Sequence, residues 1–174
     1  MKQLEDYVTT IPNFPKEGIM FRDVTTILQD PDGFKLAIDL LIKNLEGVDF
    51  DVIVGSESRG FLFGAPVAYA MGKGFILARK KGKLPREVIS EDYDLEYGTA
   101  TIEMHKDSIK PGQKVVIIDD LIATGGTTVA LIKMIERLGG DIVSIGFVME
   151  LAGLKGMEKM AKYNAFSLIK YPGI

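Results

Sequence analysis

Residues 114–128 read KVVIIDDLIATGGTT and carry the clearest structural pattern in the chain. The opening run KVVII is apolar and β-branched, which predicts a fully buried strand. Two aspartates and a short Ala-Thr-Gly-Gly-Thr turn follow. Residues 127–138 then place Val129, Ile132 and Ile135 on one face at helical spacing. A buried strand that passes through a turn into a helix is typical of an α/β unit with a parallel sheet.

The same alternation of strands and helices extends to both sides of this unit. Asp30 and Pro31 have the pattern of a helix start, and apolar residues at helical spacing continue to Leu45. Further strands are expected at 51–55, 74–79, 141–149 and 165–169, and further helices at 61–71 and 155–163. We therefore expect an α/β fold, a single domain over residues 1–174 whose central, mostly parallel sheet is flanked by helices.

Two segments interrupt the alternation. Residues 10–18, TIPNFPKEG, contain two prolines and a glycine and predict a loop or an extended arm. Residues 80–100 are polar and charged, and they are longer than most connections without structure of their own. We expect a mobile loop or a hairpin there, and segments of this kind are usually functional.

Composition excludes several classes of protein. The chain has 174 residues, close to one domain of about 150 residues. It contains no cysteine, which excludes disulfides, thiolate metal sites and cysteine nucleophiles. The only histidine is His105, which excludes sites with several histidines and is interpreted as structural. Against 21 basic residues stand 24 acidic ones, and the net charge of −3 argues against a general nucleic-acid binder.

The sequence offers no membrane or export signal. Its first ten residues include Glu5 and Asp6 and lack the apolar core of a signal peptide. The longest nearly uncharged stretch, residues 60–72, is shorter than the ~20 residues that a membrane-spanning helix needs. We therefore expect a soluble, cytoplasmic protein without a membrane partner.

The turn after the 114–118 strand predicts a phosphate site. Gly125 and Gly126 allow backbone N–H groups to approach a ligand, and the following helix presents free N–H groups and a positive dipole end. Ala123 lies in the same turn, and Thr124, Thr127 and Thr128 add hydroxyl donors. One phosphate dianion fits this arrangement.

Asp119 and Asp120 indicate what else the ligand carries. Carboxylates repel a phosphate, but an ionised carboxylate accepts hydrogen bonds from the vicinal hydroxyls of a ribose. Taken alone, the two acids are explained as turn caps and the two glycines as a turn end. Taken together within ten residues, they predict a ribose-5-phosphate site.

At this point the sequence resembles the type I phosphoribosyltransferases, and specifically their adenine-specific members. VVIIDDLIATGGTT is similar to the family's signature for 5-phosphoribosyl-1-pyrophosphate. The narrower resemblance rests on FPKEGIMFRD (14–23), GSESRGFLFG (55–64), RKKGKLP (79–85), LEYG (95–98) and LKGMEKM (154–160). The resemblance implies that family's fold, with a small N-terminal hood over residues 1–30 and a mobile lid over about 80–100.

The resemblance also assigns the pyrophosphate site. It implies that residues 55–60 form the pyrophosphate loop, with Ser58 and Arg59 as ligands and a cis peptide bond in the loop. Taken alone, this stretch is equally well a surface turn with a solvated arginine. Arg79, Lys80 and Lys83 form a basic cluster that can neutralise a pyrophosphate, although each alone is explained as a solvated side chain.

Catalytic and base-binding residues follow from the resemblance alone. It implies that Glu96 handles the purine proton and that Tyr97 closes the lid, which excludes water. It implies that Phe21 stacks on adenine while the backbone near Met20 and Arg22 reads the edge of the base. Without the resemblance, Met20 and Phe21 are explained as core residues.

The expected reaction transfers a phosphoribosyl group to N9 of adenine, giving AMP and pyrophosphate. Mg²⁺ is expected as cofactor, bound mainly through the pyrophosphate and ribose of the donor, so no protein ligands for the metal are assigned. Two alternatives remain open: a transferase for xanthine or another 6-oxopurine, and a regulator that senses phosphoribosyl pyrophosphate without catalysis. Apolar residues 60–72, expected at the sheet edge, suggest a homodimer.

Overall fold

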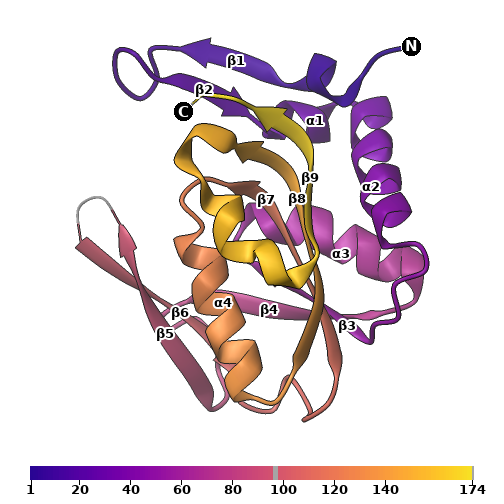
Figure 1. The fold of residues 1–174 in the computed structure, drawn as a ribbon, viewed down its shortest axis with the longest axis vertical. Coiled ribbons are helices and arrows are strands. Elements are labelled where there is room, and N and C mark those ends of the chain that lie inside the picture. Colours follow the sequence, from indigo (N-terminus) through magenta and orange to yellow (C-terminus); the bar gives the residue numbers. More distant parts are fainter. Residues whose placement is uncertain (96–97, 174) are drawn as a thin grey trace.

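The computed structural model describes residues 1–95 and 98–173 and is built on a seven-stranded sheet in the order β5-β6-β4-β3-β7-β8-β9 (Figure 1). The strands are β3 (Val52–Ser56), β4 (Gly74–Lys80), β5 (Val88–Leu95), β6 (Gly98–His105), β7 (Lys114–Ile122), β8 (Asp141–Leu151) and β9 (Ala165–Tyr171). Neighbours from β4 through β9 pair in parallel, whereas β6 pairs antiparallel with both β4 and β5. The expected α/β fold with a mostly parallel sheet is confirmed.

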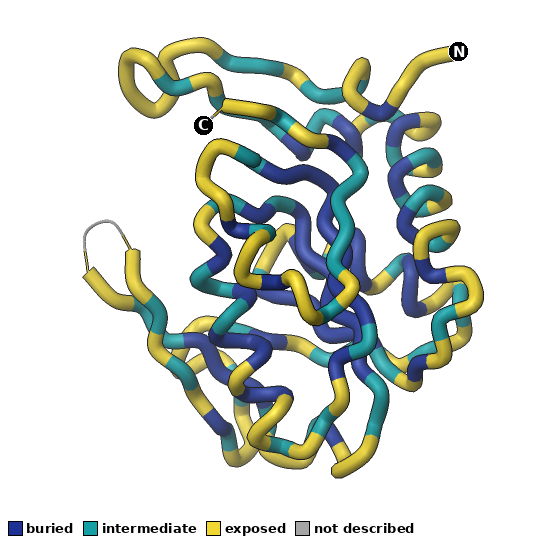
Figure 2. Tube along the Cα trace, viewed as in Figure 1, coloured by how far each residue is buried: buried dark blue, intermediate teal, exposed yellow. Residues whose placement is uncertain are grey.

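Helices cover both faces of the sheet. On one face lie α2 (Pro31–Leu45) and α3 (Arg59–Met71), and on the other lie α4 (Gly126–Arg137) and the 3₁₀ helix η3 (Gly156–Tyr163). Successive side chains of a strand point to opposite faces, so Val115 and Ile117 of β7 pack with the α4 cluster. Val116 and Ile118 pack with the α2 and α3 cluster. The central strands β3, β7 and β8 are therefore buried on both faces, as their continuous apolar runs predict (Figure 2).

Helix α3 corrects one expectation. Residues 60–72 were expected at the sheet edge, but α3 lies across the face of the sheet and packs on β3 and β7 in its middle. Phe63 and Val67 are fully buried there. The helix keeps an exposed apolar side as well, because Leu62 and Tyr69 point into solvent.

The N-terminal segment forms a separate small layer. It consists of η1 (Leu4–Tyr7), β1 (Thr9–Pro12), β2 (Met20–Asp23) and α1 (Thr25–Gln29), and β1 and β2 pair antiparallel as a two-stranded sheet. Figure 1 shows this hood near the carboxyl ends of β8 and β9. The expected loop over residues 10–18 is thus partly a strand, and Phe14–Pro15 is a cis peptide bond.

The segment after β4 is mostly a hairpin rather than a loop. β5 and β6 pair along their whole length, from Val88 opposite His105 to Leu95 opposite Gly98. Figure 1 shows this hairpin projecting from the body of the molecule. The remaining short helix, η2 (Ala152–Leu154), follows β8. No helix in the described part of the chain combines the length and apolarity needed to cross a bilayer.

Candidate active site

Two adjoining hollows lie at the carboxyl ends of β3 and β7. One has a volume of about 180 Å³ and is bounded by residues 121–128 and by the hairpin residues Tyr93 and Asp94. The other, about 450 Å³, is bounded by residues 56–59, by Lys80 and by both aspartates of β7. Tyr93, Asp119, Leu121 and Thr127 line both, so the two hollows form one continuous site. Ligands of open α/β sheets bind at this end of the strands.

The first hollow lies at the loop that was predicted to bind phosphate. Gly125 caps the start of α4 with φ of +87°, a left-handed conformation that favours glycine. The Gly125 carbonyl accepts the N–H of Val129 at 2.9 Å, which fixes the loop to the first turn of the helix. Ala123, Thr124, Gly126 and Thr127 line the hollow beside it. The structure therefore brings all five predicted loop residues to one helix N-terminus, where free N–H groups favour an anion.

The two aspartates lie inside β7 rather than in the turn after it. The strand extends to Ile122, four residues beyond the expected end, and the side chains of Asp119 and Asp120 are buried. Asp119 accepts hydrogen bonds from the Ser56 hydroxyl at 2.8 Å and from the Asp120 N–H at 2.8 Å. Burial, helped by the neighbouring Asp120 carboxylate, raises the pKa of Asp119 well above its usual range.

Asp120 has a different environment from Asp119. The Arg59 Nε lies 2.8 Å from Asp120 Oδ2, and the two side chains form an ion pair. That approach is not aligned for a hydrogen bond, and Oδ2 accepts none from any residue in the described ranges. Both oxygens of Asp119 accept hydrogen bonds within the protein. Oδ2 of Asp120 is buried and lies against the Arg59 guanidinium, so its negative charge is balanced by that ion pair.

Glu57 organises the basic cluster. Its carboxylate accepts hydrogen bonds from Arg79 Nε at 3.0 Å, from the Lys80 N–H at 3.1 Å and from Lys83 Nζ at 2.5 Å. The expected cis peptide bond of this loop joins Glu57 to Ser58. Ser58, Arg59 and Lys80 line the second hollow, whereas Arg79 and Lys83 reach it only through Glu57. The basic cluster is thus partly neutralised by an acid of the same site.

These contacts change the acidity of Glu57. Burial favours the neutral carboxyl, but the hydrogen bonds from Lys83, Lys80 and Arg79 together outweigh it and lower the pKa of Glu57 to about 2. A lowered pKa in the folded state contributes stability that is complete above the unfolded-state pKa of about 4.3. This contribution is lost as the pH falls towards the folded-state value of about 2.

We therefore expect the Glu57→Gln variant to lose less stability on acidification than the wild type does. The amide cannot titrate, so its free energy of unfolding falls less steeply between about pH 5 and 2. Urea unfolding at several pH values in that window measures the difference, and all other carboxyl groups cancel because both proteins contain them. Parallel curves for the two proteins would contradict the assigned pKa.

The remaining predicted site residues lie elsewhere. Met20, Phe21 and Arg22 are in β2 of the hood and line neither hollow. The Phe21 ring packs edge-on against Phe14 with centroids 5.1 Å apart, and Arg22 lies over the Tyr171 ring at 4.2 Å. The positions of Glu96 and Tyr97 are outside the described residues.

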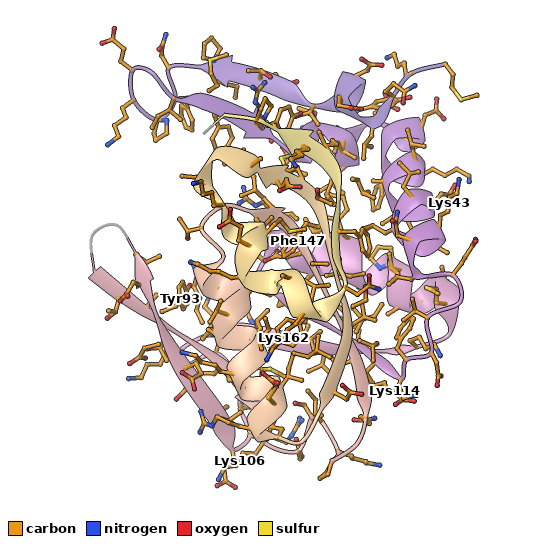
Figure 3. All side chains as sticks on the ribbon, in the orientation of Figure 1. Lys43, Tyr93, Lys106, Lys114, Phe147 and Lys162 are labelled. Carbon is orange, nitrogen blue, oxygen red and sulfur yellow. The ribbon has the colours of Figure 1, made fainter. Side chains whose placement is uncertain are left out.

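In the second hollow, sequence reasoning did not single out three of the polar side chains: Ser56, Glu57 and Tyr93. Ser56 and Glu57 stand in the quoted GSESRG stretch, directly after an apolar strand, and that position was the signal that could have found them. Tyr93 comes from the hairpin, and Figure 3 shows its side chain near the upper end of α4. β5 is rich in acidic residues, and nothing in that pattern indicates that Tyr93 lies beside the N-terminus of α4.

Known proteins share this architecture over nearly the whole chain. A family model described as a phosphoribosyl transferase domain matches residues 23–172. An adenine phosphoribosyltransferase of Lachnoclostridium phytofermentans is 66% identical over 173 residues, which make up 99% of either chain. The crystal structure of adenine phosphoribosyltransferase from Thermoanaerobacter pseudethanolicus is 51% identical, with a TM-score of 0.92 over 97% of this chain and 98% of that one.

A further solved structure contains ligands. It is adenine phosphoribosyltransferase from Saccharomyces cerevisiae in complex with an imino-altritol bisphosphate and adenine. It is 43% identical to this chain, with a TM-score of 0.88 over 95% of this chain and 96% of that one. The loop at the start of α4, the paired aspartates and the 55–60 loop therefore stand in a fold that the relatives share from end to end.

Proposed function

Because the chain belongs to the phosphoribosyltransferase family, we propose that it transfers the phosphoribosyl group of 5-phosphoribosyl-1-pyrophosphate to N9 of adenine. The products are AMP and pyrophosphate, and the activity is one of purine salvage. One observation carries the proposal: a glycine loop at a helix N-terminus lies beside two buried aspartates, in a chain whose full-length relatives are named adenine phosphoribosyltransferases.

The donor is held in three parts. Its 5-phosphate binds at Ala123, Thr124, Gly125, Gly126 and Thr127, where the backbone N–H groups of the loop and helix face the anion. The ribose hydroxyls face Asp119 and Asp120, both of which line the second hollow. The pyrophosphate, which is bonded to the ribose, then enters the second hollow, because both aspartates line that hollow.

The pyrophosphate binds at the second hollow. Ser58, Arg59 and Lys80 line it, and Arg79 and Lys83 stand behind Glu57. The Glu57 carboxylate holds these cations in place before the substrate arrives, which reduces the entropy that binding has to overcome. Charge-assisted hydrogen bonds from arginine to phosphate oxygens are roughly twice as strong as neutral hydrogen bonds.

The reaction breaks the bond between C1 of the ribose and the pyrophosphate oxygen and forms a bond from C1 to N9. C1 develops positive charge as the pyrophosphate leaves, so catalysis rests on positioning and charge stabilisation. Glu96 takes the proton that N9 of adenine loses, and Tyr97 closes the hairpin over the site. Tyr93 and Asp94 on the same hairpin already line the phosphate hollow, which supports a role for this segment in closure.

Mg²⁺ would neutralise the pyrophosphate as it leaves. No group of three or more acidic or imidazole side chains in residues 1–95 and 98–173 is placed to hold a metal ion. The ion would therefore bind mainly through oxygens of the pyrophosphate and ribose. Asp119 and Asp120 line the second hollow and carry hard oxygens of the kind that Mg²⁺ prefers, so the residues present fit this arrangement.

Adenine binds under the hood. Phe21 would stack on the base while the backbone near Met20 and Arg22 reads its edge, and these three residues lie on one short strand near the carboxyl ends of β8 and β9 (Figure 1). The Arg22 side chain is already engaged with Thr10 at 2.6 Å and with the Tyr171 ring. Its backbone is thereby fixed for recognition of the base.

The protein would work as a cytoplasmic homodimer without nucleic-acid or membrane partners. Leu62 and Tyr69 on α3 and Leu77 on β4 are exposed apolar side chains that a second copy could cover. Such a contact would lie close to Arg79 and Lys80 at the end of β4, so either residue could serve the neighbouring subunit. Light scattering of the purified protein measures the oligomeric state.

The base is tested by a panel of purines. Adenine, hypoxanthine, guanine and xanthine are each mixed with the donor and Mg²⁺, and nucleotide formation is followed. Only adenine should give rapid turnover, and a chelator should abolish it. Preference for a 6-oxopurine would overturn the substrate assignment, and donor binding without turnover on any base would support a sensor instead.

Arg59→Ala should weaken pyrophosphate and donor binding by about 10- to 100-fold, the effect of one lost charge-assisted contact of 1.5–3 kcal/mol. AMP lacks the pyrophosphate, so its affinity should fall much less. Calorimetric titration with pyrophosphate and with AMP, both with Mg²⁺, gives the two ratios.

Arg86→Ala is the matched control for Arg59→Ala. Arg86 is an exposed arginine that pairs with Asp107 at 3.1 Å and lines neither hollow, so its loss should leave both affinities unchanged. If Arg59→Ala weakens AMP and pyrophosphate equally, Arg59 does not serve the pyrophosphate and acts through Asp120 instead.

A further inference from the structure

The phosphate loop is backed by a second segment that none of the assigned site residues includes. After β8 the chain returns beneath the loop and forms η3, drawn as the gold helix in Figure 1. Gly156, the first residue of η3, is buried and lies directly against the backbone of Ala123. A Cβ at position 156 would overlap the Ala123 carbonyl oxygen and come within 3.0 Å of the Thr124 carbonyl carbon. Only a residue without a side chain permits this contact.

The contact continues along η3. A Cβ at Gly125 would meet the Met160 methyl group at 3.2 Å and the Gly156 carbonyl oxygen at 3.3 Å, so the Gly125 backbone also rests on this helix. Met160 is completely buried beneath it. The rear of the phosphate loop is therefore in van der Waals contact with one short helix from Gly156 to Met160.

Lys159 adds a polar contact at the same place. Its ammonium group donates a hydrogen bond of 2.7 Å to the Thr124 carbonyl oxygen. A trans peptide unit is planar, with its C=O and N–H pointing in opposite directions. A lysine that holds the Thr124 carbonyl on the outer side thus directs the Gly125 N–H of the same peptide unit towards the other side, where the hollow lies.

We propose that Gly156 and Lys159 are positioning residues for the 5-phosphate of the substrate. Gly156 sets how deep the loop lies, and Lys159 sets the orientation of the peptide unit that offers the Gly125 N–H to the phosphate. This inference rests on the proposed function, because it assigns the loop its phosphate. Neither residue touches the substrate, and both act through the loop backbone.

The test compares ligands that carry the 5-phosphate with one that does not. AMP, ribose 5-phosphate and pyrophosphate are titrated by calorimetry, each with Mg²⁺, into the wild type, Gly156→Ala and Lys159→Met. Gly156→Ala should lower the affinity for AMP and for ribose 5-phosphate by at least about 10-fold, since small displacements of binding groups are costly. Lys159→Met should weaken both by about 3- to 10-fold, the effect of one exposed hydrogen bond. Pyrophosphate affinity should stay unchanged in both variants.

Three controls accompany these variants. Lys159→Arg keeps a charged donor and should restore affinity to within about twofold of the wild type. Lys162, which is labelled in Figure 3, belongs to the same helix and lies over the Tyr163 ring. Lys162→Met should leave all three ligand affinities unchanged. Gly74→Ala adds a Cβ with ordinary contact to Val52 at 3.6 Å and controls for the insertion of a methyl group.

The outcomes separate this inference from the proposed function. If the wild type binds no AMP, the proposed function fails and the inference falls with it. If the wild type binds AMP and both Lys159→Met and Gly156→Ala bind AMP as tightly as the wild type does, the inference alone is overturned. The inference is also overturned if the variants lose affinity for pyrophosphate by the same factor as for AMP. In that case η3 would support the whole site rather than the phosphate loop. If Gly156→Ala does not fold, the Lys159 series decides.

Discussion

Gly125→Val should lower the affinity for AMP and for the donor by more than about 1000-fold, because several charge-assisted hydrogen bonds of 1.5–3 kcal/mol each are lost together. Valine is strongly disfavoured at the φ of +87° found at this position. Its side chain would also press on the Met160 methyl group and the Gly156 carbonyl oxygen. The loop must move, and its N–H groups no longer converge on one phosphate. Titration with AMP measures the loss.

The fold should survive this change, since residues 123–127 are not members of the buried clusters that hold the sheet together, and the one cluster atom they press on is the end of the flexible Met160 side chain. Circular dichroism and thermal unfolding verify that point, and Gly125→Ala serves as a milder variant with the same backbone demand. AMP affinity within about threefold of the wild type in a folded Gly125→Val protein would mean that the phosphate binds elsewhere, since that difference is below one hydrogen bond.

Glu96→Gln should reduce the turnover number by about 10²- to 10⁴-fold, the usual contribution of a general acid or base. The amide keeps the size and the hydrogen-bonding capacity of the side chain but cannot take the purine proton. Donor and AMP affinities should therefore stay close to those of the wild type. Single-turnover kinetics is the appropriate measurement, because slow product release can hide a chemical defect in the steady state.

Glu87→Gln is the matched control for this prediction. Glu87 is an exposed glutamate that pairs with Lys106 at 3.1 Å. Lys106, labelled in Figure 3, lies at the end of the hairpin away from its tip. This variant should turn over normally. If Glu96→Gln shows a normal single turnover, Glu96 does not accept the purine proton. The hairpin would then contribute only positioning and the exclusion of water.

The strands and helices were predictable because their signals are local. Apolar runs marked β3, β4, β7 and β8. Asp30 caps α2 as its side chain predicts, and it accepts the N–H groups of Asp32 and Gly33. The glycine turn and the helix start of α4 were predictable for the same reason, since the glycines and threonines stand within a few residues. The role of this turn in phosphate binding stays a prediction. Such patterns need no knowledge of distant contacts.

Features made by distant segments were not predictable. Glu57 meets Arg79 and Lys83 only because β3 and β4 are neighbours in the sheet, with the charged residues at their ends. The support of the Thr124 carbonyl by Lys159 spans 35 positions. Residues 80–100 were ambiguous because β5 is rich in acidic residues and has no long apolar run. The pairing of β5 with β6 decided the hairpin. The sequence names the groups of the site but not their partners.

The hood of β1 and β2 bears on how enzymes of this kind could diversify. It pairs within itself as its own two-stranded sheet and shares no backbone ladder with the seven-stranded sheet that carries the phosphate loop. The segment assigned to the nucleobase and the segments assigned to the donor are thus joined by side-chain packing alone, through Val24 and Ile27 in the cluster under α2 and α3. Substitutions of hood residues outside that cluster can therefore alter nucleobase preference while the strands that carry the donor site keep their pairing.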